Sequence, residues 1–317
     1  MQFFLITYFR NKLYDLGIIK SYSFNVPVIS VGNLNAGGTG KTPMVEFLID
    51  YLSEHYKVGV LSRGYKRKSK GFILASEKDD AKSIGDEPFQ YFSKFKNIKV
   101  AVDTKRKRGI TNLINYGVNM ILLDDAFQHR KVIPTYSILL TDYSNLYFND
   151  YLMPRGTLRE SKKGSIRADS IIITKCPSNL SDVDRFAIKK LVKPTSKQNI
   201  FFSSITYSKE LFSLNNSINI SKLNGKQVNL VTGIANSKPL IKFLKNSGLS
   251  INHFKYRDHH DYSEKDVIDF QGRITITTEK DYTKLRKFNI KDLYYLPISV
   301  NILENDNFLE ILRGKIS

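Results

Sequence analysis

The sequence predicts an α/β fold with a mostly parallel sheet and a smaller C-terminal α/β domain. Short runs rich in valine, isoleucine and leucine alternate with segments that carry the apolar spacing of helices. Such alternation is typical of parallel strands connected by helices. The chain has 317 residues, of which 41% are hydrophobic and 25% charged, so it is expected to be globular with a large core.

The larger domain is expected to contain the first six strands. Each is a short apolar run, and the first is bounded by proline and asparagine. Residues 43–55 and 105–117 have helical spacing, with Pro43 near a first turn. The six expected strands are residues 25–33, 58–64, 97–102, 119–125, 136–142 and 170–175.

The chain changes character after the sixth strand. Residues 193–219 carry polar clusters around two apolar alternations, and we predict a hinge or β-ribbon there. Residues 227–251 restart a strand–helix–strand pattern and residues 273–285 extend it, which predicts a second domain. The expected boundaries are residues 1–20 for an N-terminal helix, 21–195 for the larger domain, 196–222 for the hinge and 223–317 for the smaller domain.

Composition limits the partners and the compartment. The net charge of +19 favours an anionic partner, which could be nucleic acid, an acidic membrane surface or a phosphorylated substrate. A lysine-rich surface that only confers solubility is the alternative. There is no zinc-ligand spacing or RNA-recognition signature, so nucleic acid is disfavoured. The single cysteine, Cys176, excludes a disulfide within the chain, fits a reducing compartment and is expected to be a buried structural thiol.

The N-terminus predicts an unusual helix over residues 2–16. Thr7, Asn11 and Asp15 would form one polar stripe, and apolar side chains cover most of the remainder. This pattern fits a helix that lies in a membrane interface, although packing on the protein's own core remains open. No apolar run is long enough to cross a bilayer, and no cleavage site indicates a signal peptide.

A glycine-rich segment between a strand and a helix carries the strongest chemical signal. Its glycines allow successive N–H groups to point at phosphate oxygens, and Lys41 would reach the β- and γ-phosphates. The usual first glycine is replaced by Asn35, which can enter a left-handed turn. An ordinary glycine turn before a helix is the alternative. The residues expected to bind nucleotide are Asn35, Ala36, Gly37, Gly38, Thr39, Gly40, Lys41 and Thr42.

Two acidic pairs could supply a metal ligand or a base. Asp124 and Asp125 directly follow an apolar strand, where a carboxylate can hold Mg²⁺. Asp86 and Glu87 lie in the segment GDEP and could bind metal or accept a hydroxyl proton. The alternatives are capping roles, at a strand-terminal turn for the first pair and at a helix N-terminus for the second.

Histidines and arginines supply the remaining candidates. His259 and His260 lie in RDHHDY, and a histidine paired with a carboxylate can act as a base. Exposed loop histidines are the alternative, and no third ligand at helical spacing supports a metal site. Arg159 lies in PRGTLRES, where arginine suits binding of phosphate or carboxylate, with solvated surface as the alternative.

Seven motifs together resemble the tetraacyldisaccharide 4'-kinase family over residues 28–285. The resemblance implies a P-loop NTPase-like domain joined by a β-ribbon hinge to a smaller domain. It also implies ATP- and Mg²⁺-dependent phosphorylation of the 4'-hydroxyl of a lipid A precursor, tetraacyldisaccharide 1-phosphate. The reaction is expected at the cytoplasmic face of the Gram-negative inner membrane. The motifs, in chain order, are GNLNAGGTGKTP, LSRGY, GDEP, LLDDAFQHR, PRGTLRE, RDHHDY and TTEKD.

The resemblance also implies roles for individual residues. Asp86 and Lys41 would be catalytic, together with His259 or His260, between which the sequence does not choose. The implied metal ligands are Thr42, Asp125 and Glu87, and the implied substrate contacts are Asp124, His129 and Arg159. Ala126 stands where the family favours glycine, and its methyl group should fit if the backbone avoids positive φ.

The resemblance also favours a membrane role for the N-terminal helix, as a peripheral or monotopic anchor. The expected partners are the lipid disaccharide substrate and an anionic membrane surface, without nucleic acid or an obligatory protein partner. Another P-loop enzyme that acts on a soluble substrate, or a nucleotide-dependent switch, is the rival interpretation. The motifs GDEP and RDHHDY lie outside the phosphate loop, which argues against a simple switch.

Overall fold

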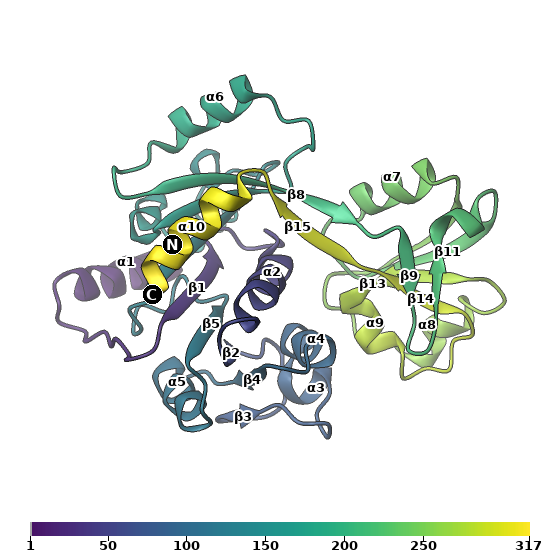
Figure 1. The fold of residues 1–317 in the computed structure, drawn as a ribbon, viewed down its shortest axis with the longest axis horizontal. Helices are drawn as coiled ribbons and strands as arrows, with labels where there is room; N and C mark the ends of the chain where they lie inside the picture. The colour runs from purple at the N-terminus through teal and green to yellow at the C-terminus, as the bar shows by residue number, and fades with distance from the viewer. Residues whose placement is uncertain (1) are drawn as a thin grey trace.

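The larger domain is organised around a mostly parallel sheet (Figure 1). The computed structural model describes the backbone of residues 2–317 and the side chains from residue 6 onward. Among these residues the larger sheet has nine strands, in the order β15-β8-β7-β6-β1-β5-β2-β4-β3. They are β1 (Val28–Asn33), β2 (Val58–Ser62), β3 (Ile73–Leu74), β4 (Lys99–Val102), β5 (Met120–Asp124), β6 (Tyr136–Asp142), β7 (Ser170–Thr174), β8 (Asn199–Tyr207) and β15 (Ile298–Ile302). Only the pairings of β3 with β4 and of β15 with β8 are antiparallel, which confirms the predicted fold class.

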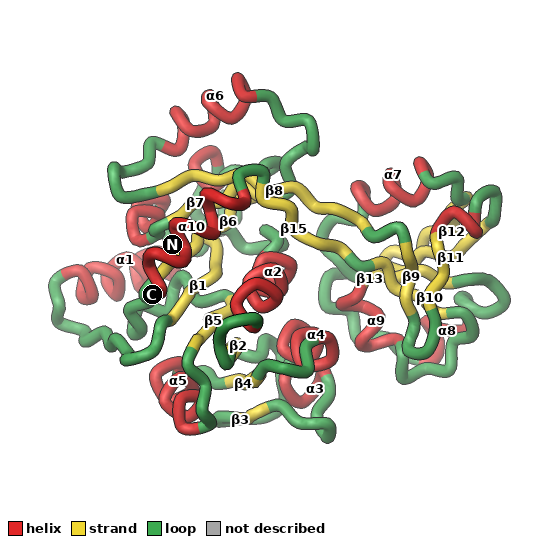
Figure 2. Tube along the Cα trace, in the orientation of Figure 1, coloured by secondary structure: helices red, strands yellow, loops and turns green. Residues whose placement is uncertain are grey.

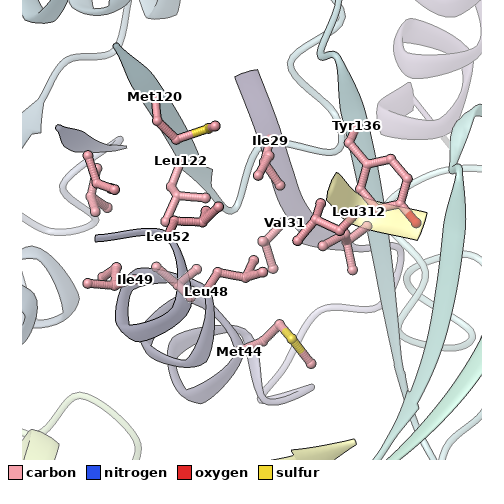
Figure 3. Close-up of a cluster of buried hydrophobic side chains, with 14 of the residues drawn as sticks. Ile29, Val31, Met44, Leu48, Ile49, Leu52, Met120, Leu122, Tyr136 and Leu312 are labelled. Carbon is pink, nitrogen blue, oxygen red and sulfur yellow. The ribbon is translucent and has the colours of Figure 1, made fainter. Parts of the chain in front are cut away.

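Helices cover both faces of the larger sheet. Side chains of β1 and β5 alternate between two apolar clusters, one shared with α2 and α10 and the other with α5. Figure 3 shows the first cluster, in which Leu48 and Leu52 of α2 lie against Val31 and Leu122. The helices of this domain are α1 (Gln2–Asp15), α2 (Lys41–Ser53), α3 (Ala81–Ile84), α4 (Asp86–Lys94), α5 (Arg106–Asn115), α6 (Asp182–Val192) and α10 (Asn305–Ile316).

The smaller domain has its own sheet and core. Its strand order, within the described residues, is β10-β9-β14-β13-β11-β12, and the four strands from β14 to β12 run parallel. The strands are β9 (Glu210–Phe212), β10 (Ser217–Asn219), β11 (Gln227–Thr232), β12 (Ser250–Lys255), β13 (Thr275–Thr278) and β14 (Leu293–Leu296). The helices are α7 (Lys238–Asn246), α8 (Glu264–Ile268) and α9 (Glu279–Leu285).

The C-terminal boundary differs from the prediction. The chain leaves the smaller domain after β14, and β15 pairs antiparallel with β8, so that two strands connect the domains (Figure 2). The final helix α10 then buries Phe308, Leu312 and Ile316 in the core of the larger domain. Residues 298–317 therefore do not belong to the smaller domain, because their apolar side chains complete a face of the larger sheet. The predicted hinge at 196–222 supplies only one connecting strand, since β9 and β10 lie in the smaller sheet.

Gly32 permits a close approach next to the phosphate loop. A Cβ atom at this position of β1 would lie 2.7 Å from the Cβ and the backbone nitrogen of Phe127. We expect Gly32→Ala to lower the free energy of unfolding in urea by about 1–3 kcal/mol, because the added methyl group would force the backbone at Phe127 to shift. Gly314→Ala is the matched control, because a Cβ there meets no atom within 4 Å. Equal stability of the two variants would contradict the close approach.

Candidate active site

The phosphate loop connects β1 to α2. Gly37 and Gly40 have φ values of 130° and 82°, in the region that side-chain-bearing residues rarely adopt, and α2 begins at Lys41. The helix N-terminus and its free N–H groups therefore face the loop, as an anion site requires. The Nζ atom of Lys41 lies 3.4 Å from Asn33 Oδ1 and 3.5 Å from Asp125 Oδ1.

Asn35 stabilises the loop in a different way from the predicted one. It is not among the described non-glycine residues with positive φ, so it does not provide a left-handed turn. Its buried side chain instead donates a hydrogen bond to Asp150 Oδ2 at 2.8 Å. Its backbone forms a bridge with Leu158. Asn35 thus ties the phosphate loop to the segment that carries Arg159.

Asp124 is the last residue of β5 and Asp125 follows it, and their surroundings shift the pKa values of the two carboxyl groups in opposite directions. Arg159 donates to both carboxylate oxygens of Asp125, at 3.0 and 3.1 Å. Burial opposes ionisation of Asp125, but Lys41 and Arg159 outweigh it and lower its pKa to about 2. Burial raises the pKa of Asp124 to about 7, and the charges of Asp125 and Glu87 add to this. The next residue, Ala126, avoids positive φ, so its methyl group fits as expected.

Arg106 and His129 are close enough to these carboxylates to interact with their charges. Arg106 begins α5, and burial lowers its pKa to about 10 despite the nearby charge of Asp124. Burial also lowers the pKa of His129 to about 4, and the charges of Arg106 and Arg63 contribute, so His129 is neutral at physiological pH. Arg106 cannot be recognised as a site residue from the sequence, because KRKRG resembles a solvated basic run until the fold buries one of its residues.

Asp86 and His259 meet across the boundary between the two domains. Asp86 is the first residue of α4, and His259 lies in the loop between β12 and α8 with a φ of 58°. Although they are 173 positions apart in the chain, Asp86 Oδ2 lies 3.0 Å from His259 Nδ1. Both side chains are largely buried, with 15% and 18% of their areas exposed.

Two lysines of α9 surround this pair. Lys280 Nζ lies 3.0 Å from His259 Nε2 and 3.4 Å from Glu87 Oε1, and Lys284 Nζ lies 3.3 Å from Asp86 Oδ2. Burial opposes ionisation of Asp86, but the hydrogen bond with His259 and the charge of Lys284 lower its pKa below the usual value. The motif TTEKD contains Lys280 but does not reveal this contact, because only the folded chain brings α9 to α4.

His260 has a different environment from His259. Its Nε2 atom lies 3.2 Å from Asp266 Oδ2, and its ring stacks on Tyr256 with centroids 4.5 Å apart. Both partners belong to the smaller domain. Of the two histidines, it is therefore His259 that the structure pairs with Asp86.

A basic cavity opens beside the Asp86–His259 pair. It has a volume of about 790 Å³ and is lined by residues between 65 and 89 of the larger domain and by Leu214 and residues between 257 and 287 of the smaller one. Several carboxylates also line it, but cations predominate, so the cavity suits an anionic ligand. The lining cations are Lys66, Lys68, Lys82, Arg257, Lys284, Arg286 and Lys287.

The phosphate loop, the carboxylate–histidine pair and the basic cavity define a nucleotide-dependent P-loop kinase. Residues 1–317 match the family described as tetraacyldisaccharide-1-P 4'-kinase. The chain belongs to this family, which confirms the family suggested by the sequence motifs and identifies the chain as a kinase.

Curated relatives and a solved structure resemble the chain over nearly its whole length. The tetraacyldisaccharide 4'-kinase of Flavobacterium johnsoniae is 46% identical, over 97% of this chain and 92% of the relative. That of Bacteroides thetaiotaomicron is 41% identical, over 97% of this chain and 89% of the relative. The crystal structure of LpxK from Aquifex aeolicus in complex with ATP matches with a TM-score of 0.81 and 31% identity, covering 100% of this chain and 96% of the other.

Proposed function

We propose that this kinase transfers the γ-phosphoryl group of ATP to the 4'-hydroxyl of tetraacyldisaccharide 1-phosphate, giving the 1,4'-bisphosphate in lipid A biosynthesis. The observation that carries the proposal is the contact between Asp86 and His259 across the domain boundary, in a chain that also has a phosphate loop. The names of the family and of its relatives supply the acceptor. Incubation with ATP, Mg²⁺ and the disaccharide 1-phosphate should yield the bisphosphate. ATP turnover without a bisphosphorylated lipid would contradict the assignment.

The phosphate side of the reaction is assigned to the loop and to Lys41. The N–H groups of the loop and the start of α2 would hold the phosphates, and Lys41 would offset charge that develops on the γ-phosphate. Arg159 donates hydrogen bonds to Asn33 and Asp125, which also contact Lys41 of the loop. Its positive charge therefore lies close to the loop. This supports a role for Arg159 near the phosphates in addition to the predicted substrate contact.

The residues present fit a magnesium ion that is shared with the nucleotide. No three His, Cys, Asp or Glu side chains in the described part of the chain form a cage for a metal. Mg²⁺, however, commonly uses one or two carboxylates together with substrate phosphates. Burial raises the pKa of Asp124, and the charges of Asp125 and Glu87 add to this, so a cation here would relieve repulsion. We assign Thr42, Asp125 and Glu87 as ligands, and bound Mg²⁺ would neutralise phosphate charge.

The proton of the attacking hydroxyl is assigned to Asp86 and His259. Lysine can only donate, so Lys280 requires His259 Nε2 to accept, and Nδ1–H then donates to Asp86. In this arrangement His259 orients Asp86, whose lowered pKa keeps it ionised as a proton acceptor. Asp124 and neutral His129 remain the proposed contacts to the acceptor sugar. The contact between domains would also exclude water from the γ-phosphate.

The N-terminal helix α1 has its polar side turned inward. Thr7 is buried, Asn11 donates to Glu160 Oε2 at 2.8 Å, and Asp15 pairs with Arg130 at 2.7 Å. The apolar side is exposed, and this arrangement supports a helix that lies in the headgroup region of an anionic membrane at its cytoplasmic face. The exposed apolar residues of α1 and its continuation include Ile6, Phe9, Leu13, Leu16 and Ile18. No helix in the described residues is long and apolar enough to cross a bilayer.

This membrane proposal predicts a loss of vesicle binding without a loss of nucleotide binding. Phe9→Gln combined with Leu16→Gln should weaken co-sedimentation with anionic phosphatidylglycerol vesicles, because the two side chains are 60% and 64% exposed. Deletion of residues 1–20 should have the same effect. Val183→Gln, on α6 and 78% exposed, is the matched control and should leave sedimentation unchanged. If the double variant sediments like the unmodified protein, α1 is not the anchor.

A further inference from the structure

A second ion cluster joins the domains at the other end of α4. Lys94 Nζ lies 2.8 Å from Glu46 Oε2 and 3.0 Å from Glu279 Oε1. Glu46 belongs to α2, which begins at Lys41, whereas Glu279 is the first residue of α9 in the smaller domain. One ammonium group therefore links the helix of the phosphate loop to the domain that carries His259.

The cluster is substantially removed from solvent. The side chains of Glu46 and Glu279 are 5% and 13% exposed, and that of Lys94 is 31% exposed. Gln90 also donates to Glu46, at 2.8 Å. Burial raises the pKa of Glu46 to about 7 and the charge of Glu279 adds to this, whereas Lys94 opposes the rise. Without Lys94, two poorly solvated carboxylates would face each other across the boundary between the domains.

Helices α4 and α9 pack against each other (Figure 1). Their two ends carry opposite charge patterns. At the catalytic end, Asp86 of α4 meets Lys284 of α9. At the distal end the signs are reversed, because α4 supplies Lys94 and α9 supplies Glu279. This reversal favours a single docking position and direction of the two helices, because a shifted pairing would bring like charges together.

We propose that Lys94 is a positioning residue, which holds the smaller domain on α4 so that His259 reaches Asp86. Lys94 contacts neither the Asp86–His259 pair nor the phosphate loop, so it would act through the docking of α9. Its bond to Glu46 anchors that docking on α2. The described contacts of Lys41 lie within the larger domain, so binding of ATP to the loop should depend little on Lys94.

Steady-state kinetics test the proposal first. Lys94→Met should lower kcat roughly tenfold with little change in the KM for ATP, because losing one partner of a mostly buried charge pair is costly. Lys94→Arg should keep most of the activity. Lys96→Met is the matched control, because Lys96 is 69% exposed and pairs only weakly with exposed Glu77 at 3.8 Å. A loss of kcat as large in this control, or an unchanged kcat in Lys94→Met, would overturn the proposal.

A measurement of the distance between the domains distinguishes a positioning role of Lys94 from a general structural defect. Spin labels at Glu54→Cys and Lys245→Cys, both exposed, would report it in a Cys176→Ala background by pulsed electron resonance. Lys94→Met should shift the distances to longer and broader values, and adding Glu279→Gln should partly restore them by removing one of the opposed carboxylates. An unchanged distance distribution, together with a reduced kcat, would overturn the positioning role.

If Lys94→Met does not fold, the single variant Glu279→Gln can be used for the distance measurement instead. It leaves the pair of Lys94 with Glu46 intact, so its fold should be preserved, and it should shift the distances in the same direction by a smaller amount. No shift would overturn the proposal. The kinetic part rests on the proposed function, whereas the distance measurement does not require turnover. If the protein does not phosphorylate the lipid but the variants change the distance between the domains, the proposed function is refuted and the positioning role of Lys94 still holds.

Discussion

Lys41→Ala should lower kcat roughly 100- to 1000-fold, which is the largest effect expected from any single substitution in this kinase. Lys41 stands at the start of α2, where its ammonium group would meet charge that increases on the γ-phosphate in the transition state. An interaction that strengthens in the transition state affects kcat more than binding. Rates of bisphosphate formation with purified variants at saturating ATP measure the effect directly.

The fold should survive this substitution. The described contacts of Lys41 are polar ones with Asn33 and Asp125, and the latter retains two hydrogen bonds from Arg159. Unfolding curves should therefore remain close to those of the unmodified protein. Lys57→Ala, at an exposed lysine after α2, is the control and should keep full activity. Turnover near the unmodified rate in Lys41→Ala would refute the assignment of the phosphate loop.

Asp86→Ala and His259→Ala should each lower kcat by about 100-fold or more, with little change in the affinity for ATP. The sugar hydroxyl is a poor nucleophile that must lose its proton as the bond to phosphorus forms. Asp86 contacts His259 at 3.0 Å, so we expect removal of either group to disable the same step. The double variant should lose hardly more than the worse single variant, since the two act as one unit.

His260→Ala is the matched control for this pair. His260 is adjacent in sequence but contacts Asp266 and Tyr256, so its substitution should reduce kcat much less than His259→Ala. Rate constants from the four variants complete the test. If the double loss equals the product of two large single losses, Asp86 and His259 act independently and the pair must be abandoned.

Local patterns were sufficient to predict the central part of the fold. The strand before the phosphate loop, the helix after it and the strand that ends at Asp124 all match the structure closely. Each depends on contacts within a short stretch, such as the glycines that permit positive φ and the apolar runs that fill a two-sided sheet. Asp86 and His259 could also be named as candidate site residues from the sequence. Their pairing, however, was implied by the family resemblance and not by their spacing in the chain.

The sequence by itself therefore determined the α/β class, the phosphate loop and the chemical types of the groups around it. Tertiary structure alone decided that His259 rather than His260 contacts Asp86, that Lys280 approaches its other nitrogen, and that α10 returns to the larger domain. It also decided that the polar side of α1 faces the protein, which an amphipathic pattern cannot specify. The physical reason is that these features depend on contacts between segments far apart in the chain, whose partners no local periodicity encodes.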